Sequence, residues 1–395
     1  MGNVVGENLR RLRVEHGWTQ ERVAREACRS AGLPIGSLTK QGVYRYEKGT
    51  RTPRDWLAPL AHALGVSITD MSKPPQMGSS SPTPAALPAL HRAAPDELAP
   101  TIRELNQRLI ALDNELYGLP IAETAARAFK TVYRRLGKHD FGAEHERDVQ
   151  AAAAELAEIA GWALFNEGRS RDSRRFSQEA LYLAQLAGDR GIELLTLQNL
   201  ALVAGWTGRP REELSIAQAV IDRGNLNPRV EAMFRAREGQ GLQQAGDSRS
   251  RQSFARARSL VQECEPTDAP EWAWWVSERE IDRQQGRVLS TVGKWDEAIP
   301  VLQRAADEQN GAHVGYELAA SVWLLDCFLS VKAWPDARHT AETLVPAVSE
   351  MSSRASLTNL ERVISRRLET GEVPADVHDL LRQLRDGIEE DPYEF

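Results

Sequence analysis

A short segment near the N-terminus carries side chains that could read the edges of DNA bases. Gln41 and Arg45 lie on the outer face of a helix that is predicted to begin near Thr39. Amide and guanidinium groups of this kind form paired hydrogen bonds with adenine and guanine in the major groove. A polar helix face by itself more often indicates a solvated surface than a binding site. The elements that surround the segment decide between these two interpretations.

Four short amphipathic helices are predicted within residues 1–72. Apolar residues recur at helical spacing in each of them, and glycines end three of them. Thr19 and Thr39 are good N-caps for the second and third helices, because a threonine hydroxyl can accept a hydrogen bond from a free backbone N–H group. The predicted core residues are, in chain order, Val5, Leu9, Leu12, Val23, Ala24, Ala27, Val43, Tyr46, Trp56, Leu57, Leu60, Ala61 and Leu64.

Several motifs in this region resemble a known family. They are Gly17-Trp18-Thr19-Gln20-Glu21, the stretch QGVYRYEKGTRTP at residues 41–53, and LAHALGV at residues 60–66. Together they are similar to the lambda-repressor-like helix-turn-helix domain of the xenobiotic-response-element type, over residues 4–70. Residues 28–37 depart from that family, because they look like an insertion of about nine residues in a turn that is usually short. Either the second helix is longer, or an extra loop is present.

The resemblance implies a role for each polar residue of the motif. Gln20, at the start of the second helix, would hold a phosphate with the free backbone N–H groups there. The start and outer face of the third helix would read bases, and the residues after it would meet the DNA backbone. The candidate DNA-binding residues are Gln20, Thr39, Lys40, Gln41, Tyr44, Arg45, Lys48 and Arg51.

The charge distribution agrees with a DNA-binding head joined to a body that avoids DNA. Residues 1–72 contain 11 Lys and Arg and 7 Asp and Glu, whereas the rest of the chain contains 38 and 49. The net charge of the whole chain is −7. The excess of positive charge is therefore confined to the segment that carries the helix-turn-helix motif.

Composition and motifs argue against several other classes of protein. No run of about 18 apolar residues predicts a membrane span, and the N-terminus lacks the pattern of a signal peptide. The three cysteines lie far apart, which argues against a disulfide framework and favours the cytoplasm. His139 and His145 are not spaced to share a helix face, so no metal is expected. No motif of a cofactor site or of an enzyme is found.

Residues 73–88 are rich in proline and serine and are predicted to form a semi-extended tether. The chain is therefore predicted to have a DNA-binding domain at 1–72, a linker at 73–100 and a helical domain at 101–395. Beyond the linker the apolar pattern is helical throughout, so the fold class is all-α.

The helical domain contains a periodic pattern of turns. Gly168, Gly208, Gly246, Gly293 and Lys332 stand in turns between amphipathic helices, at spacings of 40, 38, 47 and 39 residues. A small residue precedes each of the first four turns by seven positions, where paired helices would approach closely: Gly161, Ala201, Gly239 and Gly286. The pattern resembles about five divergent tetratricopeptide-like repeats over residues 149–369. An irregular helical bundle is the alternative.

Stacked helix pairs leave a concave groove that can hold a peptide or a similar small polar ligand. Arg283 and Arg287 lie four apart on one helix face, where an anion between them would relieve their repulsion. Glu280, Asp282 or Asp326 could neutralise them instead, and tryptophans at helical spacing, such as those at 272, 274 and 275, are more often core. The candidate ligand-binding residues are Trp162, Gln198, Asn199, Gln240, Arg283, Arg287 and Asp326, with Glu158 on the same wall.

The whole layout resembles peptide-responsive bacterial regulators of the quorum-sensing type. That resemblance implies a homodimer that binds a paired DNA operator and responds to a small intracellular peptide. Two alternatives stay open: the repeats serve only dimerisation or recruitment of another protein, or the chain is a scaffold that does not bind DNA.

Overall fold

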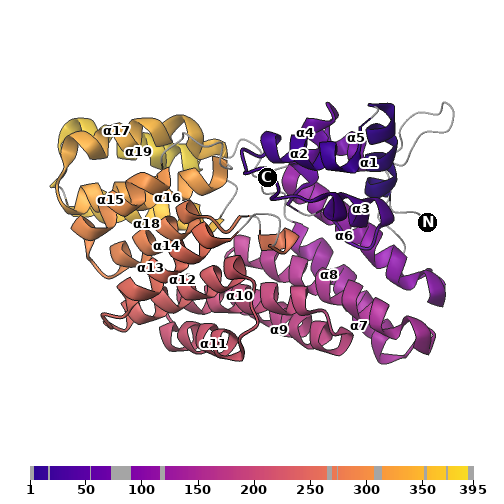
Figure 1. The fold of residues 1–395 in the computed structure, drawn as a ribbon. Helices are drawn as coiled ribbons and strands as arrows, with labels where there is room; N and C mark the ends of the chain where they lie inside the picture. The colour runs from indigo at the N-terminus through magenta and orange to yellow at the C-terminus, as the bar shows by residue number, and fades with distance from the viewer. Residues whose placement is uncertain are drawn as a thin grey trace. The chain divides into compact units, whose positions relative to one another are not determined.

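The computed structural model of the chain is all-α, as the sequence predicts. It describes residues 4–16, 18–53, 55–72, 90–115, 121–264, 269–273, 275–306, 314–350, 354–370 and 372–389. Within these residues the regular structure consists of helices, and no strand occurs (Figure 1). None of the described helices combines the length and the apolar character that crossing a bilayer requires.

The density of contacts divides the chain into two compact units. The first comprises residues 1–165, 169–203 and 264–274, and the second comprises residues 166–168, 204–263 and 275–395. Most of the predicted linker, residues 73–89, lies outside the described residues. A 3-10 helix at Pro95–Glu97 leads into helix α6, which begins at Leu98, so residues 95–100 of the predicted linker are helical.

Five short helices form the N-terminal part of the first unit. They are α1 (Val4–Glu15), α2 (Gln20–Ser30), α3 (Lys40–Lys48), α4 (Leu57–Ala63) and α5 (Ile68–Ser72). All the core residues predicted for the first four helices are buried. Helix α5 was not predicted from the sequence. It places Met71 in the core, and the Asn8 side chain donates a hydrogen bond of 3.0 Å to the Met71 carbonyl.

The rest of the first unit consists of longer helices. They are α6 (Leu98–Glu115), α7 (Ile121–Gly137), α8 (Glu146–Asn166), α9 (Ser170–Ala187) and most of α10 (Arg190–Trp206). Their apolar faces share one core, in which Ile102, Phe129, Leu156 and Leu183 come from four successive helices.

The second unit likewise consists of helices. Its helices are α11 (Pro210–Arg223), α12 (Pro228–Gln244), α13 (Ser250–Glu263), α14 (Glu278–Thr291), α15 (Trp295–Ala306), α16 (Val314–Ser330), α17 (Trp334–Leu344), α18 (Arg354–Thr370) and α19 (Ala375–Glu389). A core at the C-terminal end of this unit joins α14 to α19 and includes Leu302, Leu325, Leu344 and Leu381.

The predicted turns between paired helices are confirmed, and their backbone explains why glycine stands in four of them. Gly168, Gly208, Gly246 and Gly293 have φ of 75°, 72°, 75° and 77°. This left-handed region is strained for residues with a Cβ atom. The fifth turn uses Lys332 at φ 60°. These turns therefore end the first helix of each pair and reverse the chain.

The predicted close approach of paired helices is confirmed at the glycines. A Cβ atom on Gly239 of α12 would lie 2.8 Å from the Phe254 ring of α13. A Cβ atom on Gly161 of α8 would lie 3.0 Å from Ser177 Oγ of α9. The missing side chains therefore let each pair pack at short distance.

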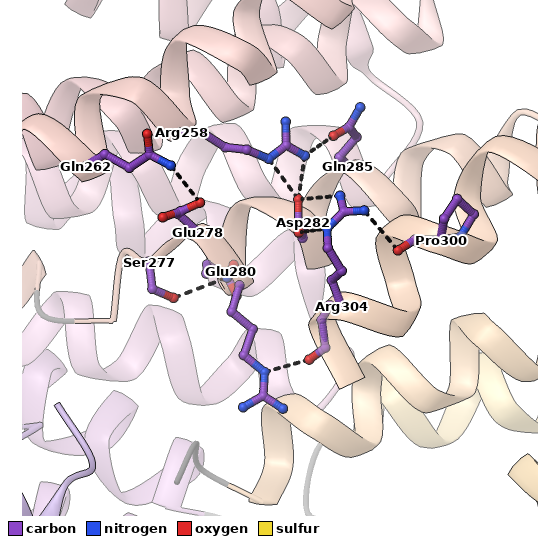
Figure 2. A network of polar contacts seen from close by, with 11 residues as sticks. Arg258, Gln262, Ser277, Glu278, Glu280, Asp282, Gln285, Pro300 and Arg304 are labelled. Carbon is purple, nitrogen blue, oxygen red and sulfur yellow. Dashed lines mark hydrogen bonds and ion pairs between the residues drawn. The ribbon is translucent and has the colours of Figure 1, made fainter. Parts of the chain in front are cut away.

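A polar network joins three successive helices of the second unit (Figure 2). Asp282 of α14 accepts hydrogen bonds from Arg258 of α13 and from Arg304 of α15, at 2.9 Å and 2.8 Å from their Nε atoms. Arg258 also donates to Gln285. Because Asp282 is buried, two arginines around it compensate for the water that its carboxylate loses. The network ties the pair α12–α13 to the pair α14–α15.

Candidate nucleic-acid interface

The caps of α2 and α3 form as the sequence predicts and fix the start of each helix. Thr19 Oγ1 accepts a hydrogen bond of 3.2 Å from the Arg22 backbone N–H, and Thr39 Oγ1 accepts one of 3.2 Å from Gly42 N–H. Gly49 closes α3 in the left-handed conformation, at φ 69°. The two ends of α3 are therefore set by local chemistry.

Helix α3 has one buried face and one exposed polar face. Val43 and Tyr46 are buried against the other helices of the domain. The outer side presents donors for base edges and for phosphates, and a half-exposed aromatic ring. Its exposed residues are Lys40, Gln41, Tyr44, Arg45 and Lys48. The Lys48 ammonium lies 5.8 Å from the Tyr44 ring centre, so these two side chains extend together over the surface.

Glu47 holds α3 against α1 and α2, a role that the sequence analysis missed. Arg13 of α1 forms an ion pair of 2.5 Å with Glu47, and Gln20 Nε2 of α2 donates to Glu47 Oε2 at 2.7 Å. Arg13 also donates to the Trp18 carbonyl at 3.1 Å. Gln20 was predicted to hold a phosphate, and here its amide group positions α3. The sequence did contain a signal for this role, because Glu47 is the one acidic residue of a helix that otherwise carries basic charges.

Thr39 and Arg51 flank the exposed face of α3 and are both partly buried. Thr39 uses its hydroxyl as the cap of α3. Arg51 lies in the bend that follows the helix. Nearby, the Arg22 guanidinium stacks 4.8 Å from the centre of the Trp18 ring at the start of α2. The predicted DNA-binding residues thus lie on α3 or next to it, and the outer face of α3 is the most accessible part.

The insertion between α2 and α3 is an extra loop and not a longer second helix. Helix α2 ends at Ser30 and α3 begins at Lys40. Cys28 anchors the loop, because its carbonyl accepts from Leu33 N–H at 2.9 Å and its sulfur accepts from Leu38 N–H at 3.3 Å. Burial raises the pKa of the Cys28 thiol, so this sulfur stays protonated and structural.

Comparison with known proteins agrees with this geometry. Residues 4–72 match a helix-turn-helix domain family, so the N-terminal part of the chain is a helix-turn-helix domain.

No curated protein matches the chain. Among solved structures, the chain is similar to BtubC (BKLC) from P. vanneervenii, at 16% identity and a TM-score of 0.38, over 64% of this chain and 92% of that one. It is also similar to PlcR of Bacillus thuringiensis, solved with the peptide PapR7 and DNA, at 14% identity and a TM-score of 0.32, over 77% and 94%. Likenesses this distant carry no argument about function.

The candidate ligand residues of the first unit form a buried chain of hydrogen bonds. Gln198 Nε2 donates to Asn199 Oδ1 at 2.8 Å, and Asn199 Nδ2 donates to Glu158 Oε1 at 2.8 Å. All three residues are buried. Trp162 is half-buried, and its ring centre lies 5.7 Å from that of Phe165. These groups are therefore satisfied by one another within α8 and α10.

Three candidates of the second unit belong to one cluster. Arg283 forms an ion pair of 2.6 Å with Glu280 on the same helix. Arg287 donates to Gln240, and Gln240 Nε2 donates to Gln284 at 2.7 Å. Burial lowers the pKa of Arg287 to about 10. The alternative in which Glu280 neutralises Arg283 is thus the arrangement observed.

Asp326, the last candidate, lies in a separate cluster between α16 and α18. Arg362 donates to Asp326 Oδ2 at 3.2 Å, and Arg367 lies 3.9 Å from Oδ1. Asp326 Oδ1 and Asn359 Nδ2 are buried, and no hydrogen-bond partner reaches either atom within the described residues. The Arg362 guanidinium lies 5.9 Å from the Trp323 ring centre. Arg362 is half-exposed, so this cluster is open to solvent on one side.

Two of the tryptophans at 272, 274 and 275 are described, and neither is exposed. Trp272 is buried and Trp275 is half-buried, while Trp274 lies outside the described residues. Among the described residues, no group of three or more His, Cys, Asp and Glu side chains could hold a metal ion.

A buried carboxyl group was also missed by the sequence analysis. Glu213 of α11 is fully buried, and its nearest cation is Arg237 of α12, at 3.9 Å. Gly205 of α10 leaves the space that this carboxyl group fills, because a Cβ atom there would collide with it. Burial raises the pKa of Glu213 to about 7, against the opposing effects of Arg237 and Arg287.

Proposed function

We propose that the protein is a transcription regulator that binds DNA sequence-specifically through α3. The observation that carries this proposal is a helix-turn-helix domain whose α3 is held by Glu47 and presents Gln41, Tyr44 and Arg45 outward. A helix of this kind fits the major groove and can read base edges by direct hydrogen bonds. The alternative function, a scaffold that does not bind DNA, lacks such support. It gives no reason why the exposed face of α3 should carry these polar side chains.

Genome-wide mapping of the DNA bound by the full-length protein tests this function. We expect a small set of sites that share a motif, with affinity that falls steeply as salt rises. Each phosphate contact would contribute a slope of about −0.9 in log K against log salt. Binding spread evenly over the genome would contradict the proposal.

We further propose that the helical repeats pair two copies of the chain. Helix-turn-helix domains of this architecture commonly act on two half-sites, and a two-fold pair matches a paired operator. The internal pairing of Arg283 and the buried chain from Gln198 to Glu158 favour repeats that serve assembly. An open pocket lined by Gln303, Arg304, Ala306 and Leu324 contains none of the candidate ligand residues.

A ligand of the repeats is a second proposal, and the Asp326 cluster supports it. Asp326 Oδ1 and Asn359 Nδ2 would gain hydrogen bonds from a small polar molecule or a peptide end. Such a ligand would regulate DNA binding only by favouring one state of the dimer over another. A tenfold change in DNA affinity would require a coupling free energy of about 1.4 kcal/mol.

Arg362 is the residue with which to test the ligand. Arg287 is buried, so its truncation would disturb the core and not only a ligand site. We expect that the low-molecular-weight fraction of a lysate of the producing cells changes the operator affinity of the wild type. Arg362→Gln should abolish that change, and Arg338→Gln on the exposed side of α17 is the matched control. An unaltered response in Arg362→Gln would refute this site.

A further inference from the structure

The loop between α2 and α3 presents an aliphatic side chain to solvent. Ile35 is 60% exposed, so its apolar side chain is largely open to solvent. It stands in a tight turn, in which Ser37 N–H donates to the Pro34 carbonyl at 3.1 Å and Ser37 Oγ donates to the same oxygen at 2.8 Å. Gly36 has φ 105°, which a side chain would strain. Ile35 therefore occupies the outer corner of a defined turn.

The base of this loop is anchored in the core of the domain. Leu38 is 2% exposed, and its N–H group donates to Cys28 Sγ. Leu33 N–H donates to the Cys28 carbonyl, so both ends of the turn are held by one residue of α2. An isoleucine side chain is stiff at χ1. Ile35 would consequently lose little conformational entropy when it contacts another molecule.

The surroundings of Ile35 indicate which molecule that is. No acidic residue occurs between Glu26 and Glu47, whereas the basic residues Lys40 and Arg45 do. Arg29, the other basic residue of this stretch, forms an ion pair of 2.9 Å with Glu26. Ile35 stands five positions before Lys40, the first residue of α3, a reach of at most about 18 Å. A single aliphatic group on a segment whose excess charge is positive suits DNA better than a protein, because a stable protein interface buries about 800 Å² on each partner.

We propose that Ile35 contacts the C5-methyl group of a thymine, at the end of the half-site that the N-terminal end of α3 approaches. This inference rests on the proposed function of α3. Methyl groups of thymine lie in the major groove and are read by apolar side chains. Ile35 is thus an additional specificity-determining residue, outside the recognition helix and within the insertion.

Replacement of thymine by deoxyuridine in the mapped operator tests the contact, because only the methyl group is lost. Binding of the full-length protein is followed by fluorescence anisotropy, with one thymine replaced at a time. We expect one replacement, at the end of a half-site, to weaken wild-type binding about fourfold, the factor for one methyl-sized group. Ile35→Ser should weaken binding to the unmodified operator by a similar factor and be insensitive to that replacement. Ile35→Val should retain most of the sensitivity.

Leu186→Ser, at an exposed position of α9, is the matched control and should bind as the wild type does. Thermal melting of each variant confirms that it is folded. The inference is overturned if Ile35→Ser binds as the wild type does, or if its loss is the same on every deoxyuridine operator. A lower mass of Ile35→Ser in light scattering would instead assign Ile35 to contacts between copies and also overturn it. A wild type that prefers no DNA sequence would refute the proposed function itself.

Discussion

At the scale of single residues, Glu213 of the second unit has a fully buried carboxyl group. Its buried carboxyl group accepts no hydrogen bond from the described residues, and it fills the space that Gly205 leaves. Its pKa of about 7 lies above the usual value of 4.5, so the folded state holds the proton more tightly than the unfolded state does. The resulting contribution to stability is complete below pH 4.5 and is lost as the pH rises through 7.

Glu213→Gln removes this pH dependence, because an amide cannot ionise. We expect the free energy of unfolding of the variant, relative to the wild type, to increase between pH 5 and pH 8. The shift from 4.5 to about 7 sets the upper limit of the increase at roughly 3 kcal/mol. Urea unfolding at a series of pH values measures it, with Glu297→Gln on the exposed side of α15 as control. Parallel pH profiles for wild type and variant would show that Arg237 keeps Glu213 ionised.

The residues of α3 differ in what they should contribute to DNA binding. Gln41→Ala and Arg45→Ala should each reduce discrimination between the operator and random DNA by about 1–3 kcal/mol, the value of a bidentate base contact. Lys48→Ala should weaken binding to all DNA alike and lessen the salt slope by about 1, because we propose that Lys48 contacts a phosphate and not a base. Competition titrations at several salt concentrations separate the two effects. If all three variants act alike on both DNAs, the assignment of α3 is wrong.

At the scale of elements, the helix pairs depend on close contact at their glycines. Gly239→Ala should destabilise the protein by about 1–3 kcal/mol, because the new methyl group would overlap the buried Phe254 ring. Gly137→Ala is the matched control, since no atom lies within 4 Å of its new Cβ. Equilibrium unfolding in urea measures both variants. Equal stability of the two would mean that α12 and α13 can separate without cost.

The sequence predicted helices and turns better than it predicted which side chains interact across different helices. Caps at Thr19 and Thr39 and the left-handed glycines are set within a few residues, so their pattern is visible in the chain. Ion pairs such as the one from Asp282 to Arg258 join different helices and depend on the rotation of each helix about its axis. Helix α5, only five residues long, is stabilised mainly by tertiary contacts of Met71.

The candidate sites show the same difference between features set within one helix and contacts that depend on several residues. The outer face of α3 was predictable because its inner residues, Val43 and Tyr46, fix the register of the helix. The candidate ligand residues were predicted from repeat register alone, and the structure distributes them over separate clusters. Arg283 illustrates the reason: its partner Glu280 lies three residues earlier, and sequence alone left Glu280, Asp282 and Asp326 as equal candidates.

At the scale of the whole molecule, the proposed pairing of two chains makes a direct prediction. Light scattering of the full-length protein at tens of micromolar should give twice the mass of one chain, which is 43.9 kDa. An operator cut to one half-site should bind far more weakly, because the second head would lose its site. A single-chain mass together with full affinity for a half-site would contradict the pairing.

The network around Asp282 has a mechanical consequence. Repeat arrays generally yield to a pulling force in small steps, since each helix pair touches only its neighbours. Here Asp282 joins α13 to α15 through Arg258 and Arg304, across the boundary between two pairs. Under tension, α12–α13 and α14–α15 should therefore rupture as a single step about twice the length of one pair, so this part of the chain would behave as one stiff link and not as two.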